Sequence, residues 1–179
     1  LTGGLANSCL KSLGLKTGES LATVDAETLI KVKDILREYN KKIVLPFDAI
    51  VGKKYDETFV VSKDINKIEN DEIIGDIGPK TLKIYKKIID ESKTIFMNGT
   101  AGIYEEPKYS NGTLELLNIV TSSMAKTIAG GGDCIGAIDK FNMTDKFTYI
   151  STGGGATLEY IINENLPAIN AIADKEEVL

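Results

Sequence analysis

Five turns that are rich in glycine fall at the inferred ends of strands, and this repeat restricts the fold more than any other feature of the sequence. The segments between the turns carry apolar residues at helical spacing, so strands and helices alternate along the chain. Such alternation produces right-handed crossovers and a mostly parallel sheet. We predict an α/β fold, a three-layer αβα Rossmann-like domain. The turns are "TGG" (2–4), "GDIGP" (75–79), "NGTAG" (98–102), "GGGD" (130–133) and "TGGGA" (152–156).

Apolar spacing and end signals predict several helices. Residues 25–39 form a helical pattern behind Asp25, a suitable N-cap. Another helix begins at Pro79, where the missing N–H costs nothing. A further helix is predicted over residues 113–125, with Met124 among its inward side chains.

Extended segments fall between these helices. The sequence "KKIVLPFDAIVG" predicts a buried strand that ends at Leu45 and a second extended piece that ends at Val51. Residues 58–62 can pair with the second piece as a small β-hairpin, and residues 93–99 form a strand that breaks at Asn98.

Composition indicates one globular domain. The 179 residues are enough for one core, and 42% apolar with 26% charged residues is typical of a soluble protein. No apolar run approaches the roughly 18 residues that would cross a membrane, so no membrane partner is expected. Cys9 and Cys134 are too few for a disulfide framework, which favours a cytoplasmic location.

Charge narrows the possible chemistry. A net charge of −5 argues against nucleic-acid binding, which needs a surplus of Lys and Arg. The chain has no histidine, so any catalysis must depend on positioning, backbone donors, carboxylates or lysine.

The glycine turns indicate a phosphate ligand. In an open parallel sheet, ligands bind at the carboxyl ends of the strands, where helices present free N–H groups. One glycine-rich turn more often reflects tight packing, but two GGG triplets that open consecutive helices are harder to explain in that way.

Asp133 follows one of these triplets and has two interpretations. It can be the N-cap of the next helix. Alternatively, it can be part of a ligand site. A carboxylate repels a phosphate beside it unless a cation lies between them, and this favours Mg²⁺ bound together with a nucleotide.

Three long motifs together resemble one family. "IFMNGTAGIYEEPKYSNGT", "TIAGGGDCIGAIDKF" and "YISTGGGATLEYI", in this order, are similar to the carboxyl-terminal, nucleotide-binding half of phosphoglycerate kinase. The resemblance covers Leu1 to about Asn170, and "LTGGLANSCL" with "NGTAG" leans towards the archaeal branch. It implies transfer of a phosphoryl group between 1,3-bisphosphoglycerate and ADP, which gives ATP and 3-phosphoglycerate.

The resemblance also implies roles for individual residues. Asp133 would hold Mg²⁺, and Glu105 would bind the ribose hydroxyls. Backbone groups and small side chains would form the rest of the site: Gly3, Gly4 and Gly78 at the adenine, Asn98, Gly131, Gly132 and Cys134 at the nucleotide phosphates, and Gly153, Gly154 and Gly155 at the phosphoryl group in transit.

Several of these positions have simpler alternatives or depart from the family. Glu105 can belong to a solvated loop, and Asn98 can be a turn residue. Cys134 replaces the usual Ser or Thr and is either a packed, inert thiol or a reactive one at a helix start. Thr100 and Thr157 replace the more common Pro and Ser.

Parts of the family pattern have no counterpart in the sequence. These are the first strand-helix unit with "GGAK" and its phosphate-binding lysine, and the amino-terminal substrate domain with its arginine. We therefore expect residues 1–179 to be a nucleotide-binding domain truncated on its amino-terminal side. Because the absent groups supply positive charge to the transition state, we expect this chain to bind nucleotide poorly and to catalyse little alone. A non-catalytic nucleotide-binding module and a structural domain with relic loops are the alternatives.

Overall fold

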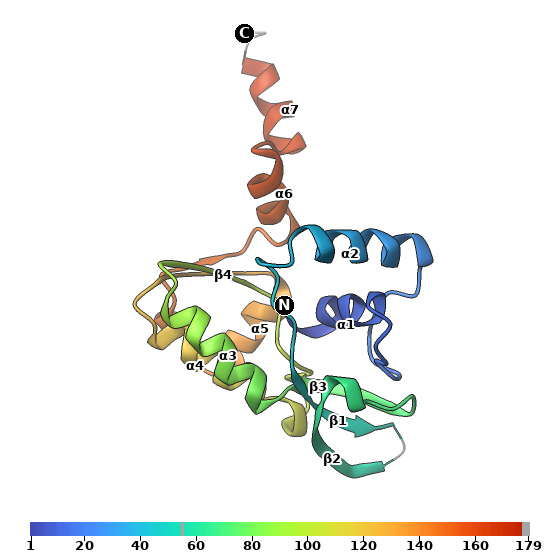
Figure 1. Ribbon diagram of the computed structural model, residues 1–179. Coiled ribbons are helices and arrows are strands. Elements are labelled where there is room, and N and C mark those ends of the chain that lie inside the picture. The colour runs from blue at the N-terminus through green and yellow to red at the C-terminus, as the bar shows by residue number, and fades with distance from the viewer. Residues whose placement is uncertain (55, 177–179) are drawn as a thin grey trace. The chain divides into compact units, whose positions relative to one another are not determined.

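The computed structural model describes residues 1–54 and 56–176. Contacts divide the chain into two compact units. Figure 1 labels the helices and strands along the chain. Unit 1 comprises Leu1–Lys93 and Thr100–Ala125, and unit 2 comprises Thr94–Gly99 and the chain from Lys126 onwards.

The helices of unit 1 pack in pairs, α1 with α2 and α3 with α4. The predicted helix over residues 25–39 is confirmed, and its N-cap Asp25 accepts a hydrogen bond of 2.7 Å from the backbone N–H of Thr28. The predicted helix at Pro79 is also confirmed. The helices and 3₁₀ turns of unit 1 are α1 (Gly3–Ser12), α2 (Ala26–Glu38), η1 (Ile65–Lys67), α3 (Pro79–Asp90), η2 (Pro107–Tyr109) and α4 (Asn111–Ser122).

The prediction that Met124 points inward is wrong. Helix α4 ends at Ser122, and the backbone of Ser123 is extended (φ −74°, ψ 161°), so the chain leaves the helix before residue 124. The Met124 side chain is fully exposed.

An antiparallel sheet in the order β2-β1-β3 completes unit 1. Its strands are β1 (Asp48–Lys53), β2 (Asp56–Asp64) and β3 (Glu72–Ile77). The predicted hairpin is confirmed as β1 and β2, and β3 adds a strand on the other side of β1. The strand predicted to end at Leu45 is absent, because residues 43–46 join none of the sheet ladders in the described part of the chain.

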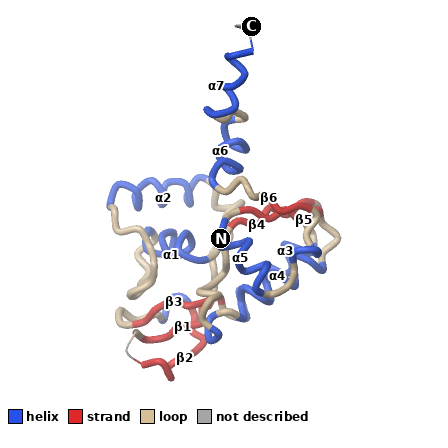
Figure 2. Tube along the Cα trace, turned by 180° about the vertical axis from the view of Figure 1, so that it is seen from behind, coloured by secondary structure: helices blue, strands red, loops and turns tan. Residues whose placement is uncertain are grey.

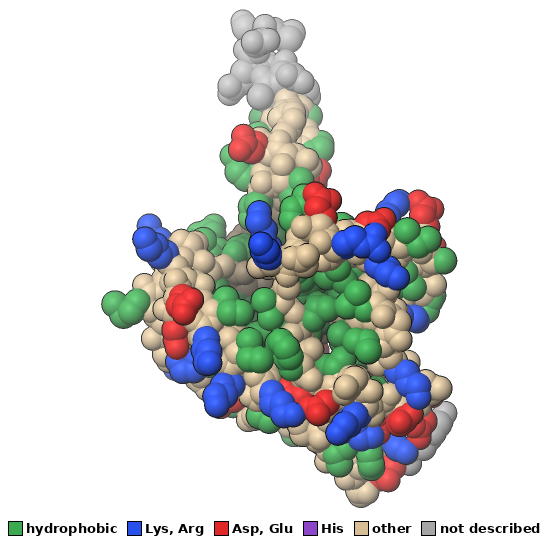
Figure 3. Space-filling model, viewed as in Figure 1, with side chains coloured by type: hydrophobic (Ala, Val, Ile, Leu, Met, Phe, Trp, Pro, Cys, Tyr) green, Lys and Arg blue, Asp and Glu red, His purple; other side chains and the backbone are tan. Residues whose placement is uncertain are grey.

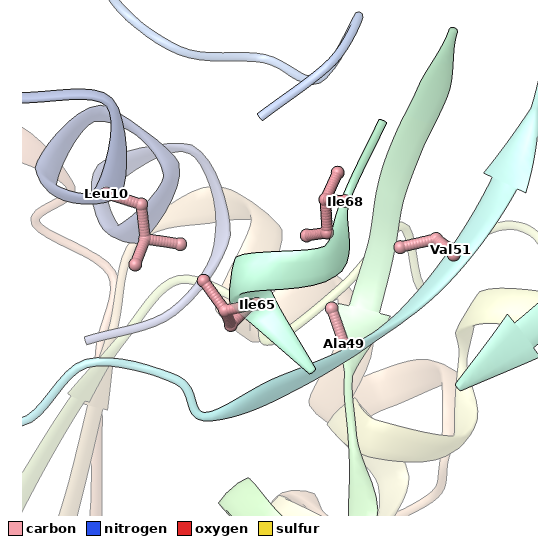
Figure 4. Close-up of a cluster of buried hydrophobic side chains, with 5 residues drawn as sticks. All are labelled: Leu10, Ala49, Val51, Ile65 and Ile68. Carbon is pink, nitrogen blue, oxygen red and sulfur yellow. The ribbon is translucent and has the colours of Figure 1, made fainter. Parts of the chain in front are cut away.

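A cluster of apolar side chains joins three elements of unit 1. Leu10 comes from α1, Ala49 and Val51 from β1, and Ile65 and Ile68 from the turn around η1, and they point toward one another (Figure 4). All five are at most 6% exposed, so they form a dry core between the helix and the sheet.

Unit 2 contains a parallel sheet in the order β4-β5-β6, which confirms the α/β fold class (Figure 2). Its strands are β4 (Thr94–Asn98), β5 (Lys126–Gly130) and β6 (Tyr149–Ser151), and its helices are α5 (Gly132–Lys140), η3 (Thr144–Lys146), α6 (Gly155–Asn163) and α7 (Pro167–Glu176). Cys134, Ala137 and Ile138 form the buried face of α5, and α5 contacts β5. No helix in the described residues is long and apolar enough to cross a lipid bilayer.

A buried carboxylate from the sheet caps helix α3. Asp48 is 1% exposed and lies at the start of β1. Its Oδ2 accepts from the N–H of Lys80 at 2.9 Å, and its Oδ1 accepts from the N–H and the hydroxyl of Thr81 at 2.8 and 2.7 Å. The cap therefore fixes the first turn of α3 to the sheet.

We expect Asp48→Ala to lower the free energy of unfolding by about 2–4 kcal/mol, because it leaves buried N–H groups without acceptors. Asp25→Ala removes an exposed N-cap carboxylate and should cost only about 1 kcal/mol. Chemical denaturation of both variants measures the difference. An equal loss of unfolding free energy in both variants would show that burial of the Asp48 cap adds nothing to stability.

Candidate functional site

The carboxyl ends of the three parallel strands meet at one edge of unit 2. Asn98 pairs with Gly130, and Gly130 pairs with Ser151, so the last residues of β4, β5 and β6 stand in register. The chain turns immediately after each of them, and the turns after β5 and β6 lead into α5 and α6. The sheet thus places three of the predicted loops at its carboxyl edge, where ligands bind in open parallel sheets.

Asn98 and Gly131 lie against each other at this edge. Gly131 has φ +89°, a conformation that disfavours any side chain, and an added Cβ would lie 2.3 Å from the Asn98 Oδ1. Gly132, the first residue of α5, has open space where a Cβ would stand. The turn therefore combines a fixed backbone with an uncovered approach to the helix start.

Asp133 is exposed in the first turn of α5, and it is not the N-cap. The N-cap position is Gly131, and no side chain caps it. The alternative that Asp133 is present to cap this helix is therefore wrong. A carboxylate in the first turn still interacts favourably with the positive end of the helix dipole.

Cys134 is fully buried beneath the same turn. Its Sγ lies 3.8 Å from the carbonyl oxygen of Met97. Burial raises the pKa of the thiol, and the backbone N–H groups of Gly99 and Gly130 offset this only in part. These observations favour the packed, inert thiol over the reactive one.

A pair of hydroxyls holds the turn after β6. The hydroxyl oxygens of Ser151 and Thr157 lie 2.7 Å apart, and a Cβ on Gly153 would lie 2.6 Å from the Thr157 Oγ1. A Cβ on Gly154 or on Gly155 would enter open space. The N-cap of α6 is Gly154, again without a side-chain cap.

In unit 1, the glycine turn at residues 2–4 meets the turn that follows β4. The Thr2 hydroxyl donates to the carbonyl oxygen of Thr100 at 3.1 Å. Gly3 has φ +59°, and its Cβ would lie 3.3 Å from the same oxygen. Gly4 lies against the side chain of Leu21, where a Cβ would approach to 3.2 Å.

Gly78 is buried, and Asp48 explains why this position is a glycine. A Cβ there would lie 2.2 Å from the Asp48 Cγ. The contact requires a residue without a side chain whether or not a ligand binds nearby.

Glu105 is exposed on a loop whose backbone is tied down. The Thr113 hydroxyl accepts from the N–H groups of Ala101 and Gly102 at 3.2 and 3.1 Å. The N–H of Ile103 donates to the carbonyl oxygen of Gly75 at 2.8 Å. The loop is solvated at Glu105, but its start is fixed to α4 and β3.

Sequence reasoning missed Asp76, a buried carboxylate within the turn "GDIGP". Asp76 is 1% exposed and accepts hydrogen bonds from the N–H groups of Ile77 at 2.9 Å and Gly112 at 2.5 Å. Burial raises its pKa to about 6, although both N–H donors act in the opposite direction. An acidic residue between two glycines directly after an apolar run was the available signal.

An apolar groove of about 720 Å³ lies in unit 1. Green side chains gather in hollows on the face shown in Figure 3. None of the predicted site residues lines the groove, whose lining consists of Leu10, Leu13, Leu15, Ile43, Val44, Leu45, Pro46, Phe47, Asp64, Ile65, Asn66 and Lys80.

A sequence model of the family described as "Phosphoglycerate kinase" matches residues 1–164. The chain belongs to the phosphoglycerate kinase family. It is 39% identical to phosphoglycerate kinase of Dictyoglomus turgidum over 176 residues, and this matched region covers 97% of this chain and 44% of that protein. It is 42% identical to phosphoglycerate kinase of Wigglesworthia glossinidia brevipalpis over 171 residues, and this matched region covers 95% of this chain and 42% of that protein.

Solved structures of the phosphoglycerate kinase family have the same fold. The enzyme of Coxiella burnetii superposes with a TM-score of 0.86 at 38% identity, over 94% of this chain and 44% of that one. The enzyme of Pyrococcus horikoshii superposes with a TM-score of 0.79 at 30% identity, over 99% of this chain and 45% of that one. The chain therefore spans less than half the length of these relatives.

The residues predicted to contact the nucleotide belong to both units, each described by itself. Unit 2 contains the residues predicted to contact phosphate and metal, and unit 1 contains those predicted to contact adenine and ribose. Unit 2 holds Asn98, Gly131, Gly132, Asp133, Cys134, Gly153, Gly154 and Gly155, and unit 1 holds Gly3, Gly4, Gly78 and Glu105.

We expect Gly131→Ala to destabilise the chain by about 1–3 kcal/mol, because the side chain enforces a strained backbone and meets Asn98. Gly132→Ala is the matched control, since its Cβ enters open space at the first helical position. Its stability should stay within about 0.5 kcal/mol of the parent or increase. Thermal or denaturant melts distinguish the two, and an equal loss in both would contradict the geometry of the turn.

Asp76 should make stability depend on pH. The pKa of its carboxyl is 3.8 in the unfolded chain and about 6 in the folded chain. Between these two pH values the folded state therefore binds more protons than the unfolded state. The free energy of unfolding should therefore fall by about 3 kcal/mol from this group as pH rises from about 4 to 6.

Asp76→Asn should remove this fall, and denaturation curves at several pH values measure it. Asp34→Asn makes the same change in charge at an exposed site on α2 and serves as the control. Parallel pH profiles for the parent and Asp76→Asn would contradict the assignment.

Proposed function

We propose that the chain is the carboxyl-terminal, nucleotide-binding domain of a phosphoglycerate kinase. The observation that carries this proposal is the state of the helix starts at the edge of the parallel sheet. Helices α5 and α6 begin with glycine N-caps and have no side-chain cap. Their N–H groups are thus available to an anionic ligand, and phosphates bind such helix starts.

Each turn of unit 2 has its own part in this proposal. The N–H groups at the start of α5, from Gly132 to Cys134, bind the nucleotide phosphates, with Asn98 beside them. The N–H groups of Gly153, Gly154 and Gly155 face the phosphoryl group in transit. Open space at Gly132, Gly154 and Gly155 gives phosphate oxygens close access to the backbone.

The residues present fit a magnesium ion that arrives with the nucleotide. Asp133 is an exposed carboxylate in the first turn of α5. Among the described residues, no group of three or more acidic, cysteine or histidine side chains forms a protein cage for a metal. Mg²⁺ is commonly held by one or two carboxylates together with substrate phosphates, and when bound it neutralises their charge.

In unit 1, Glu105 binds the ribose hydroxyls, and Gly3, Gly4 and Gly78 form walls of the adenine slot. The fixed backbone of the loop that carries Glu105 supports this role, because a hydroxyl contact needs a carboxylate at a constant position. The contact of Gly3 with Thr100 supports a common surface for the turns at residues 2–4 and 100–102.

The reaction of the parent protein transfers the acyl phosphate of 1,3-bisphosphoglycerate to the terminal phosphate oxygen of ADP. The bond from phosphorus to the carboxyl oxygen breaks, a bond to ADP forms, and ATP and 3-phosphoglycerate result. Such a transfer requires alignment and charge stabilisation more than a histidine base. The "GGAK" lysine and the amino-terminal arginine of the family pattern are not among residues 1–179, so we propose that these residues act in catalysis together with groups that supply this positive charge.

The motifs alone support the archaeal branch, and the low cysteine content alone supports a cytoplasmic location. A non-catalytic nucleotide-binding module is the second candidate.

A coupled assay separates the candidates. We expect no phosphoryl transfer by the 179-residue chain, and measurable transfer when the amino-terminal portion of a matched relative is joined to it. Binding of Mg-ADP without transfer in the joined protein would favour the non-catalytic module. Failure to bind Mg-ADP at millimolar concentration would favour a structural domain.

Asp133→Asn tests the magnesium site. Its affinity for Mg-ADP should fall about 10- to 100-fold, the equivalent of one charge-assisted contact, in calorimetric titrations. With EDTA present, it should bind free ADP at least as well as the parent, because a repulsive carboxylate is gone. Asp145→Asn on η3 is the charge-matched control, and an equal loss with and without Mg²⁺ would contradict the metal role.

A further inference from the structure

Asp76 is a buried carboxylate that joins three segments of unit 1. It stands on β3, and its Oδ1 accepts from the neighbouring N–H of Ile77. Its Oδ2 accepts from the N–H of Gly112 in the first turn of α4. A Cβ on Gly102 would lie 2.5 Å from Oδ1, so the loop that leaves β4 packs directly on the carboxylate.

The same loop is held at a second point by Thr113. This fully buried residue of α4 accepts two hydrogen bonds on its hydroxyl, from the N–H groups of Ala101 and Gly102. Asp76 fixes the start of α4 through Gly112, the residue before Thr113. The Asp76 carboxylate therefore holds the start of α4, and the Thr113 hydroxyl on that helix holds the beginning of the loop.

Tyr109 anchors the other end of the loop. Its buried ring fills the space left by two glycines of the antiparallel sheet. A Cβ would lie 1.7 Å from the Tyr109 hydroxyl oxygen at Gly52 and 2.1 Å from the ring at Gly75. Glu105 thus projects from a loop of about ten residues that is tied to the sheet at both ends.

We propose that Asp76 is a positioning residue, which holds this loop so that Glu105 stands where the ribose hydroxyls of a bound nucleotide would reach it. The inference rests on the proposed function, because it assumes that Glu105 binds the ribose. It assigns the selectivity for the ribose to a side chain that does not touch the nucleotide.

A carboxylate is required at this position because each of its oxygens accepts from a different N–H group. An asparagine offers one acceptor oxygen and would turn an NH₂ donor toward the other N–H. The N-cap of α4, Ser110, makes no side-chain cap, so Asp76 supplies the acceptor from another element. Its raised pKa shows that the buried charge is unfavourable, and holding the loop accounts for its presence.

A pair of ligands separates positioning from simple stabilisation. Mg-ADP carries the ribose hydroxyls, and Mg-2′,3′-dideoxy-ADP lacks them. Both are titrated up to millimolar concentration into the 179-residue chain and its Asp76→Asn, Glu105→Gln and double variants. The parent should prefer ADP about tenfold, the equivalent of one hydrogen bond to a charged group.

Asp76→Asn should reduce this preference to about twofold or less, mainly through loss of ADP affinity, as should Glu105→Gln. The double variant should lose no more preference than either single variant. Glu72→Gln replaces another carboxylate of β3 that is 1% exposed, and it should keep the tenfold preference whatever it does to stability.

Thr113→Val keeps the test decisive if Asp76→Asn does not fold, since it removes only the acceptor of the two loop N–H groups. It should lose the preference in the same way. A parent chain that binds no Mg-ADP overturns the proposed function and this inference with it. If the parent prefers ADP but Asp76→Asn or Thr113→Val weakens the binding of both ligands equally, this inference alone is overturned.

Discussion

Every helix start must satisfy N–H groups that have no partner within the helix, and the way in which each start does so organises this chain. In unit 1, carboxylates of the chain reach the starts of three of the four α-helices, and the start of α1 has no side-chain cap. Asp25 caps α2 locally, Asp48 caps α3 from β1, and Asp76 reaches the first turn of α4 from β3. In unit 2, glycine occupies the N-cap of both α5 and α6, and no side chain caps either helix. The difference separates helix starts that hold the fold from the two that we propose bind a ligand.

The features predicted from sequence are those with a local cause. Asp25 before an apolar helical pattern gives a capped helix, and glycines after apolar runs give the turns at the edge of the parallel sheet. The features that sequence missed depend on contacts between distant segments. Residues 43–46 have the composition of a strand, but a strand also needs a neighbour. Asp76 precedes Gly112 by 36 residues, and nothing in the turn "GDIGP" specifies that partner.

The structure also changes the reasons for particular residues of the candidate site. Gly78 accommodates the Asp48 carboxylate, and Gly131 accommodates the side chain of Asn98. Gly154 has φ +53°, which itself favours glycine. Gly132 and Gly155 have no such φ and meet no protein atom that would exclude a side chain, so the internal structure does not explain them. If backbone N–H groups bind phosphate here, as we propose, these two positions carry the stronger argument for a ligand.

Asp133 is the remaining electrostatic problem of this edge, because it places a negative charge beside helix starts that are proposed to bind anions. It does not cap α5, so the needs of the helix do not explain it fully. The first-turn dipole interaction is worth about 0.3–1 kcal/mol at an exposed site, and several other residues would leave the turn intact. A divalent cation between the carboxylate and the phosphates reverses the sign of the interaction, since both anions then attract the same ion. This change of sign is the physical reason for which we propose Asp133 as part of a ligand site.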